Sequence, residues 1–454
     1  MLTFATSQPS NKKRFTSMES LHTRDHRVLW HPCSQMKDYE QFKPLEVLRA
    51  SGPYIYLKDG TKIIDAISSW WCKTLGHQHS RLKKALSQQL ELFEHVILAN
   101  TSNELIVTLS EKLLSKVPHC HKVFYASDGS SALEIAMKMS LHARTLLGES
   151  HKNKFIALQN AYHGETLATM SVSDLGIYRG AYESLLFDTH FIQHIPYVNS
   201  TDDPLWENCE NVWKIIEKSL EPLVENATAI VFEPILQAAG GMLIYSKDFL
   251  KRLCDFAKKH RIHIIADEVM TGFGRTGKMF AVEHANIAPD FICVAKGLTA
   301  GFLPMSAVMT HDQIYHLFYD DYAKGRSFLH SHTHSGNALA ASVAIEVLNI
   351  FAEEKIVENT QYLHVMMRDA FRDIEHSTQK IKNVRSIGAM VAADLCCDSS
   401  IRMGYQVYLE AVKLGALLRP VGNTIYWVPP LNVTEDVIED LRNITEKAIG
   451  KAFY

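Results

Sequence analysis

Short apolar runs alternate with longer amphipathic stretches through the middle of the chain. The runs, rich in β-branched and aromatic residues, lie at 122–126, 153–158, 228–232, 261–266 and 290–294. Between them, residues 130–147 and 246–260 carry apolar side chains at helical spacing. Strands and helices that alternate in this way build a mainly parallel sheet with helices on both faces. The pattern predicts an α/β fold.

The two ends of the chain have a different pattern. Residues 54–66 (YIYLKDGTKIIDA) resemble a hairpin with a turn at Asp59-Gly60, and 384–431 carries shorter strands. We therefore expect a smaller α+β domain built from both termini beside a large α/β domain. The expected boundaries are 1–75 and 341–454 for the smaller domain and 76–340 for the large one.

Composition excludes several classes of protein. Of the 454 residues, 46% are hydrophobic and 21% are charged, as in ordinary globular proteins with a large core. A net charge of -3 offers no basic field for nucleic acid, and no apolar stretch approaches the roughly 18 residues of a membrane span. The eight cysteines show no repeated CxxC pairing, so neither a zinc ribbon nor a secreted disulfide framework is indicated. We expect a cytoplasmic protein.

Candidate ligand-binding residues follow the predicted strands. In open parallel sheets, ligands bind at the carboxyl ends of the strands, near helix N-termini. Gly129 and Ser130 begin a helix after the first strand, where they would form either a phosphate cup or an ordinary helix cap. Tyr162 and His163 follow the second strand; they could contact a ring, although such a pair more often serves packing.

One apolar strand ends on two acids, in the stretch IIADEVMTGFGRTG (264–277). A metal site, a phosphate loop or a carboxylate held against a cationic cofactor nitrogen would each explain Asp267. The next strand ends just before Lys296. An amine, an acid and a phosphate cup at one sheet edge are the three parts that pyridoxal phosphate requires.

Five motifs occur in an order and spacing that resemble a known family. They are SDGSS, NAYHGET, EPILQAAGG, IIADEVMTGFGRTG and AKGLTAGFLPMSA. Together they resemble the class III, or ω-amino acid, aminotransferases of fold type I along nearly the whole chain. The resemblance implies a pyridoxal phosphate-dependent aminotransferase with a large cofactor-binding domain and a smaller α+β domain.

Further motifs resemble one branch of that family. They are LWHPCSQMKDY, DAISSWWCKTLGH, FLHSHTHSGNALA and LLRPVGNTIYWVPP. That branch transaminates 8-amino-7-oxononanoate to 7,8-diaminononanoate in biotin biosynthesis. Its usual amino donor is S-adenosylmethionine, which we favour, while some relatives use lysine.

The resemblance assigns roles in cofactor binding. Lys296 would form the Schiff base and move the proton, and Asp267 would pair with the pyridine nitrogen. Gly129 and Ser130 would hold the phosphate. The complete expected cofactor set is Gly129, Ser130, Tyr162, Asp267, Lys296, His332 and Thr333. His332 and Thr333 match a loop that reaches the phosphate from the neighbouring subunit, which implies a homodimer.

Substrate contacts are assigned in the same way. Arg419 matches the arginine that receives a substrate carboxylate, although a surface ion pair is the alternative. The remaining expected pocket residues are Trp70, Tyr162, Tyr426, Ser331 and Cys33. Many members of the family have the motif WHPY, and Cys33 occupies the position of its tyrosine. Ser331-His332 replaces a Gly-Pro pair of the family. For Trp71 we expect core packing, and for Arg275 either a donor contact or a loop-stabilising role.

Two other functions stay open. One is a different class III enzyme, such as a general ω-transaminase, against which the SSWW, WHPC and RPVGNTIYW segments argue. The other is a dinucleotide-binding oxidoreductase, because GFGRTG resembles a glycine fingerprint. That fingerprint reads GxGxxG between an early strand and its helix, and the spacing here does not match.

Overall fold

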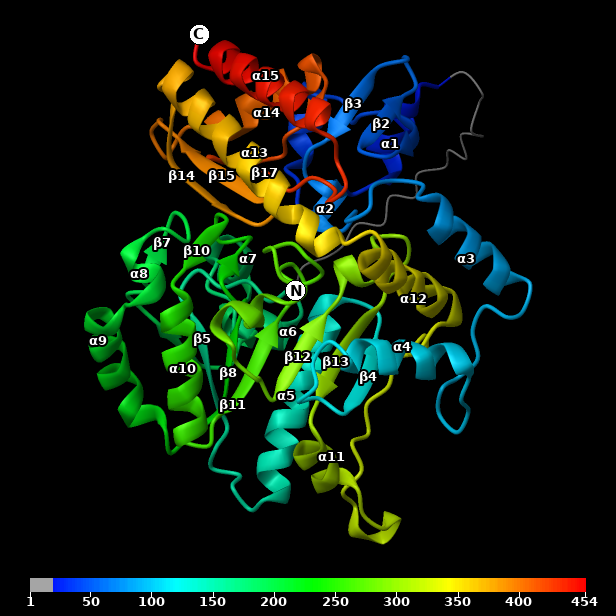
Figure 1. Ribbon diagram of the computed structural model, residues 1–454, viewed down its shortest axis with the longest axis vertical. Coiled ribbons are helices and arrows are strands. Elements are labelled where there is room, and N and C mark those ends of the chain that lie inside the picture. Colours follow the sequence, from blue (N-terminus) through cyan, green and yellow to red (C-terminus); the bar gives the residue numbers. More distant parts are fainter. Residues whose placement is uncertain (1–18) are drawn as a thin grey trace, which may run out of the picture.

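Seven strands form the large sheet at the centre of one lobe of the computed structural model, which describes residues 19–454 (Figure 1). In order across the sheet they are β4 (Lys122–Ala126), β13 (Ser306–Thr310), β12 (Phe291–Val294), β11 (His263–Asp267), β8 (Ala227–Phe232), β5 (Lys154–Leu158) and β6 (Thr189–Ile192). Within the described residues, only β13 runs antiparallel to its neighbours in this sheet. The predicted mainly parallel sheet is confirmed, and all five predicted strands belong to it.

Helices cover both faces of this sheet, because its central strands bury the side chains of both faces. On β11, Ile264 and Ala266 join one core cluster while Ile265 joins another on the opposite face. The first cluster includes α10 (Lys247–Lys259), and the second includes α5 (Gly129–Leu146). Both helices lie where the sequence pattern predicts them.

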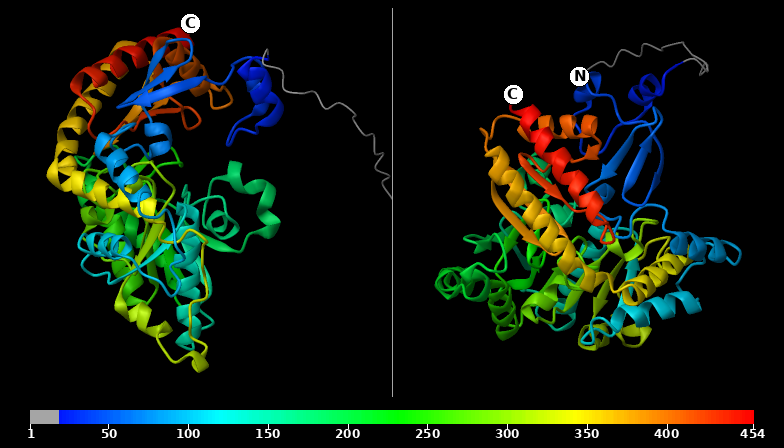
Figure 2. Two further views of the ribbon diagram at one scale, coloured as in Figure 1. Left: turned by 90° about the vertical axis from the view of Figure 1, so that its right-hand side faces the viewer. Right: turned by 45° about the horizontal axis from the view of Figure 1, so that its top comes forward.

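The remaining elements of the large lobe surround the sheet. Its other helices are α3 (Ser80–Leu90), α4 (Glu104–Leu114), α6 (Leu167–Ser171), α7 (Gly176–Arg179), α8 (Pro204–Glu207), α9 (Glu210–Leu220), α11 (Asp312–Phe318) and α12 (Ala338–Glu353). A small sheet is formed by β7 (Tyr197–Val198), β10 (Leu243–Tyr245) and β9 (Leu236–Gln237). Helices α3 and α4 both pack on α12. Viewed from the side, the α7 segment projects on the same side of the molecule as α1 (Leu21–Val28) (Figure 2).

The second lobe joins the two ends of the chain. Its first sheet contains β1 (Val47–Ser51), β2 (Tyr54–Leu57), β3 (Lys62–Asp65) and β16 (Ala416–Leu417). Its second contains β14 (Ile381–Ile387), β15 (Met390–Leu395) and β17 (Thr424–Trp427). Its long helices are α13 (Ile356–Thr378), α14 (Met403–Leu414) and α15 (Glu435–Ala452). Because β16 pairs with β3, segments more than 300 residues apart share one sheet.

The predicted hairpin is present as β2 and β3. These strands pair antiparallel, and Gly60 in the turn has φ +91°, a conformation that favours glycine. The division of the chain at 75 and 340 stays a prediction, and residues 1–18 lie outside the described part. Across residues 19–454, no helix combines the length and apolar content that crossing a membrane requires.

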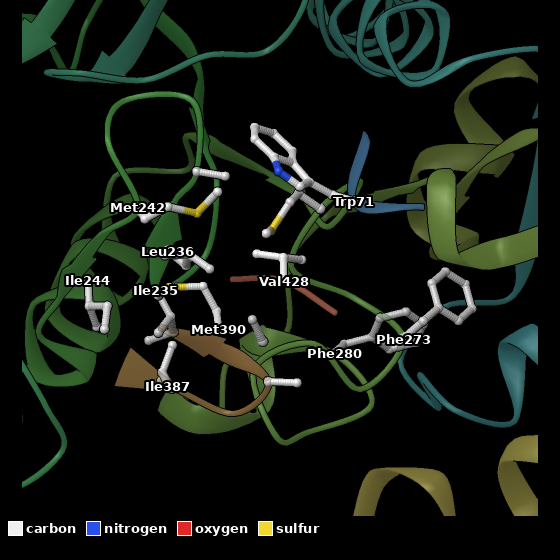
Figure 3. Packing of buried hydrophobic residues seen from close by; sticks show 14 of the residues in the cluster. Trp71, Ile235, Leu236, Met242, Ile244, Phe273, Phe280, Ile387, Met390 and Val428 are labelled. Carbon is white, nitrogen blue, oxygen red and sulfur yellow. The ribbon is translucent and has the colours of Figure 1, made fainter. Parts of the chain in front are cut away.

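A shared apolar core joins the two lobes. Trp71, Met390 and Val428 from the small lobe gather with Phe273 and Phe280 from the loop after β11 (Figure 3). This packing closes the small lobe over the edge of the large sheet where the parallel strands end.

Arg275 links the loop after β11 to the small lobe by hydrogen bonds. Its guanidinium is buried, and Nη1 donates to the carbonyl oxygens of Ala389 at 2.9 Å and Pro429 at 2.8 Å. Burial lowers the pKa of Arg275 to about 9. Of its two expected roles, the structure therefore supports the loop-stabilising one, because Arg275 holds the loop after β11 against the small lobe.

Candidate active site

A cavity of about 1050 Å³ lies between the two lobes, at the carboxyl ends of the parallel strands. Five strands place residues in its wall at or shortly after their carboxyl ends. These are Gly129 and Ser130 after β4, Tyr162 and His163 after β5, Glu233 after β8, Asp267 on β11 and Lys296 after β12. The sheet thus brings together side chains that are up to 167 positions apart, as expected for an α/β sheet.

Lys296 points its amine into this cavity. Its Nζ lies 4.5 Å from the centroid of the Trp71 ring. Burial lowers the pKa of Lys296, while the nearby carboxylates of Asp267 and Glu233 oppose this shift. An amine with a lowered pKa has a larger uncharged fraction, so it can act as a nucleophile or accept a proton.

Asp267 forms a buried pair with His163. The carboxylate is 5% exposed; its Oδ2 accepts a hydrogen bond from His163 Nδ1 at 2.8 Å, and its Oδ1 accepts from the backbone N–H of Val269 at 3.1 Å. The backbone N–H of His163 donates to Ser173 Oγ at 2.9 Å. These contacts fix the orientation of the carboxylate. The sequence marked His163 as a contact or packing residue, and its place behind Asp267 emerges only in the fold.

The two neighbouring acids of the DEV segment face different surroundings. Glu268 is fully buried away from the cavity, where it accepts from Thr271 Oγ1 at 2.5 Å and from the N–H of Val282 at 2.8 Å. Burial raises its pKa to about 7. Glu268 therefore holds the loop after β11, and Asp267 alone faces the cavity.

Glu233 connects two loops of the large lobe, one after β5 and one after β8. Its carboxylate accepts from the N–H groups of Tyr162 and Ala238, both at 3.1 Å. Burial raises its pKa to about 7. This buried acid fixes the loop that carries Tyr162 and His163 beside the end of β11.

The N-terminus of α5 opens on the cavity. Asp128 caps the helix by accepting from the N–H of Ser131 at 2.9 Å and from its hydroxyl at 2.8 Å. A Cβ on Gly129 would lie 2.9 Å from Val269, and one on Gly164 would lie 2.1 Å from Ser130 Oγ. The helix cap is formed by Asp128 and Ser131, whereas Gly129 and Ser130 line the cavity, so the expected phosphate cup stays a prediction.

The small lobe and the N-terminal segment form the opposite wall. The guanidinium of Arg419 lies 4.6 Å from the centroid of the Trp70 ring, and its Nη2 donates to the carbonyl oxygen of Cys33 at 2.8 Å. Cys33 Sγ lies 3.4 Å from the hydroxyl of Tyr178 on α7. All four residues line the cavity. Tyr178 carried no recognisable sequence signal, because α7 is a single turn in an irregular segment.

Three aromatic residues complete the cavity wall. Tyr162 donates its hydroxyl to Glu165 Oε1 at 2.9 Å, and burial raises its pKa. Tyr426 accepts a hydrogen bond from the indole N–H of Trp71 at 3.1 Å. Trp71 is 6% exposed and belongs to the core, as expected, but it also lines the cavity next to Lys296.

Three expected site residues lie apart from this cavity within a single chain. His332 Nε2 lies 3.1 Å from His330 Nε2, and the carbonyl of Thr333 accepts from His95 at 2.7 Å. Ser331 directly precedes His332 in the sequence, and none of Ser331, His332 and Thr333 is among the described residues that line the cavity. Their expected contact with the site of a neighbouring subunit stays a prediction.

The chain resembles known aminotransferases over nearly its whole length. Residues 35–449 match the aminotransferase class-III family. The adenosylmethionine-8-amino-7-oxononanoate aminotransferase of Helicobacter pylori is 38% identical over 93% of this chain and 95% of its own length. The enzyme of the same name from Aquifex aeolicus is 36% identical over 92% of this chain and 94% of its own length.

Solved structures share the fold. The crystal structure of the adenosylmethionine-8-amino-7-oxononanoate aminotransferase from Methanocaldococcus jannaschii superposes with a TM-score of 0.87 and 32% identity, over 95% of this chain and 98% of that one. A PLP-bound amine transaminase from an uncultivated Pseudomonas species gives a TM-score of 0.86 and 28% identity, over 94% and 99%. The fold is that of the fold type I transferases, and the chain belongs to the class III aminotransferase family.

Proposed function

We propose that this enzyme transfers an amino group to 8-amino-7-oxononanoate, giving the 7,8-diaminononanoate used in biotin biosynthesis. The observation that carries the proposal is the single cavity that Lys296, the Asp267–His163 pair and Arg419 all line. The names and the 36–38% identity of the two relatives support the same acceptor.

Pyridoxal phosphate fits the residues of this cavity. The N-terminus of α5 is free of side-chain bulk at Gly129, and the tight approach of Gly164 to Ser130 leaves no room for a side chain there. Free N–H groups and a helix dipole suit a phosphate dianion. Gly129 and Ser130 would hold that phosphate, Asp267 the ring nitrogen and Lys296 the aldehyde carbon. When bound, the cofactor supplies an electron sink for the carbon from which the proton is removed.

Residues of this chain would then handle the protons. Asp267, fixed by His163, would keep the ring nitrogen protonated through an ionic hydrogen bond. Lys296 would accept and return the proton at its Nζ, since burial lowers the pKa of this amine. Tyr162 would pack against the ring, and Glu233 would keep the Tyr162 loop in place.

Arg419 would receive the carboxylate of the acceptor on the opposite wall. The guanidinium lines the cavity and pairs there with the carbonyl of Cys33, so its remaining donors are available to a bidentate partner. Trp70, Tyr162 and Tyr426 would surround the aliphatic chain of the acceptor. Cys33 and Tyr178 would lie beside the substrate and take part in choosing the amino donor, for which we favour S-adenosylmethionine over lysine.

We also propose a homodimer located in the cytoplasm. Ser331, His332 and Thr333 lie outside the cavity of their own chain, which suits a loop that serves the site of a second copy. All eight cysteines are free in the structure, as suits a reducing compartment.

A coupled assay with mass detection tests this function. Protein loaded with pyridoxal phosphate is given 8-amino-7-oxononanoate together with S-adenosylmethionine or with lysine, and 7,8-diaminononanoate is measured. We expect product with S-adenosylmethionine. Product with lysine alone would overturn the donor assignment, and no product with either donor, while simple ω-amino acids react, would overturn the acceptor.

A further inference from the structure

Two consecutive tryptophans face two different cations of the active site. The Lys296 amine lies 4.5 Å from the ring centroid of Trp71, and the Arg419 guanidinium lies 4.6 Å from that of Trp70. Both distances lie within the range of cation–π attraction. The consecutive side chains of Trp70 and Trp71 thus face opposite walls of the cavity. Trp71 faces the wall with Lys296, and Trp70 faces the wall with Arg419.

A strained turn produces this division. In α2 (Ser68–Trp71), Ser68 has φ +50°, Ser69 has φ +62° and Trp71 has φ +64°. Residues other than glycine pay about 1–3 kcal/mol for each such conformation, which persists only where the surroundings enforce it. The backbone therefore departs from a regular helix at the two tryptophans.

Asp65 is the group that enforces the turn. Its carboxylate is fully buried and accepts from the N–H and the hydroxyl of Ser69, both at 2.8 Å. It also pairs with His77 Nε2 at 2.9 Å. Three contacts on one buried carboxylate fix the start of the turn.

The Trp71 ring is fixed from its far side as well. Its indole N–H donates to the Tyr426 hydroxyl, and the ring packs in the core between the lobes (Figure 3). One part of the ring remains open to the cavity, where it meets the amine of Lys296. A ring held in this way attracts the ammonium form of an amine more strongly than it attracts the uncharged form.

We propose that Trp71 is a positioning residue for amino transfer, whose ring face holds the ammonium form of Lys296 in a turn that Asp65 fixes. The proposal rests on the proposed function in one respect, which is the role of Lys296 in accepting and returning the proton. The other titratable groups that face this amine are the carboxyls of Asp267 and Glu233 and the thiol of Cys72. The ring thus adds to the two carboxylates in favouring the charged amine, against the effect of burial.

Fluorinated tryptophans placed only at position 71 test this idea without changing the packing. Added fluorine weakens the negative face of the ring while the shape stays nearly the same. In the full chain freed of cofactor, the pH dependence of acetylation at Lys296 is followed by peptide mass spectrometry. We expect the midpoint to fall with each added fluorine, and the uncharged fraction near pH 8 to rise about threefold to tenfold over the series.

The same substitutions at Trp70 are the matched control. They should leave the acetylation midpoint of Lys296 unchanged, because the Trp70 ring faces Arg419 instead. A midpoint that stays constant across the series at position 71, or that shifts equally at position 70, would overturn the proposal. Asp65→Asn should shift the midpoint in the same direction, if the turn is what aims the ring.

The cofactor-loaded enzyme separates this proposal from the proposed function. If 8-amino-7-oxononanoate is not the substrate, the acetylation midpoints at position 71 still move. If the substrate is right and Trp71 only fills space, product forms and the pH–rate profiles of the fluorinated series coincide. We expect the acidic limb of that profile to move to lower pH with each fluorine.

Discussion

The two walls of the cavity are built in opposite ways. The large-lobe wall carries Asp267 and Lys296 at the ends of adjacent parallel strands, and the buried carboxylate of Asp267 accepts a hydrogen bond from His163. The small-lobe wall carries Cys33, Trp70 and Arg419 in short irregular segments from both ends of the chain, and Trp70 is 42% exposed. From this difference we expect the large-lobe wall to carry out the reaction and the small-lobe wall to select the substrate.

The largest effect is expected at the centre of the large-lobe wall. Lys296→Ala should reduce amino transfer by about 10⁴-fold or more, because it removes both the nucleophile and the proton carrier. Steady-state rates measure this, with cofactor content checked by absorbance. Lys259→Ala, on the exposed end of α10, is the matched control. Near-normal activity of Lys296→Ala would contradict the assignment of the reaction to the large-lobe wall.

Asp267→Asn should cost about 10²- to 10³-fold in kcat. The amide keeps the size of the side chain but loses the charge that would hold a protonated ring nitrogen. Donor and acceptor KM values should change little, and His163→Gln should give a smaller loss in the same direction. If Asp267→Asn raised KM and left kcat normal, Asp267 would be assigned to substrate binding, which would contradict its expected role in the reaction.

Glu268, the buried acid next to Asp267, should affect the stability of the fold and not the rate of amino transfer. Burial raises the pKa of Glu268 to about 7, so the folded state prefers the protonated carboxyl. Its contribution to stability is complete below the unfolded pKa of about 4.5 and is lost as the pH rises through about 7. As the pH rises from about 4.5 to about 7, the free energy of unfolding of Glu268→Gln should therefore increase by about 3 kcal/mol relative to that of the parent. Urea titrations at several pH values measure this; parallel pH curves would contradict it.

On the small-lobe wall, Arg419→Ala should raise the KM for 8-amino-7-oxononanoate by about 10- to 100-fold. A hydrogen bond to a charged group contributes about 1.5–3 kcal/mol. The limiting rate at saturation should stay close to that of the parent. Arg419→Lys keeps the charge without the planar fork and should lie in between. A loss confined to kcat would show that the two walls are not separate in function.

The smallest effect is expected at the contact between Cys33 and Tyr178. Tyr178→Phe removes a hydroxyl that lies 3.4 Å from the thiol, which should change the KM for the amino donor by about twofold to tenfold. The KM for the acceptor is measured beside it and should stay constant. Tyr182→Phe, an exposed tyrosine nearby, is the control. Equal changes in the KM values of donor and acceptor would show that Tyr178 does not contribute to donor selection.

The same contrast explains how much the sequence could predict. Asp267 and Lys296 each end an apolar run, and the ends of parallel strands meet at one edge, so their proximity followed from the strand pattern. The reversal of β13 did not follow, because the buried run SAVMT carries no mark of its direction. Five of the seven strands were predictable, whereas β6, β13 and the reversed direction of β13 were not.

The small-lobe wall was less predictable because its contacts span long distances in the sequence. Cys33 and Tyr178 are 145 positions apart, and neither belongs to a periodic element that could fix its direction. The opposite directions of Trp70 and Trp71 depend on the irregular backbone of α2, in which Ser68, Ser69 and Trp71 have positive φ angles. Such a backbone cannot be foreseen from serine and tryptophan, which seldom adopt it.

Single-turnover kinetics test the division between the two walls most directly. Enzyme carrying the aminated cofactor is mixed with increasing 8-amino-7-oxononanoate, and the absorbance change is followed for the parent, Asp267→Asn and Arg419→Ala. We predict that Asp267→Asn lowers the maximal rate at unchanged half-saturation, and that Arg419→Ala raises half-saturation at an unchanged maximal rate. The reverse assignment, or equal losses in both quantities for both variants, would contradict the account.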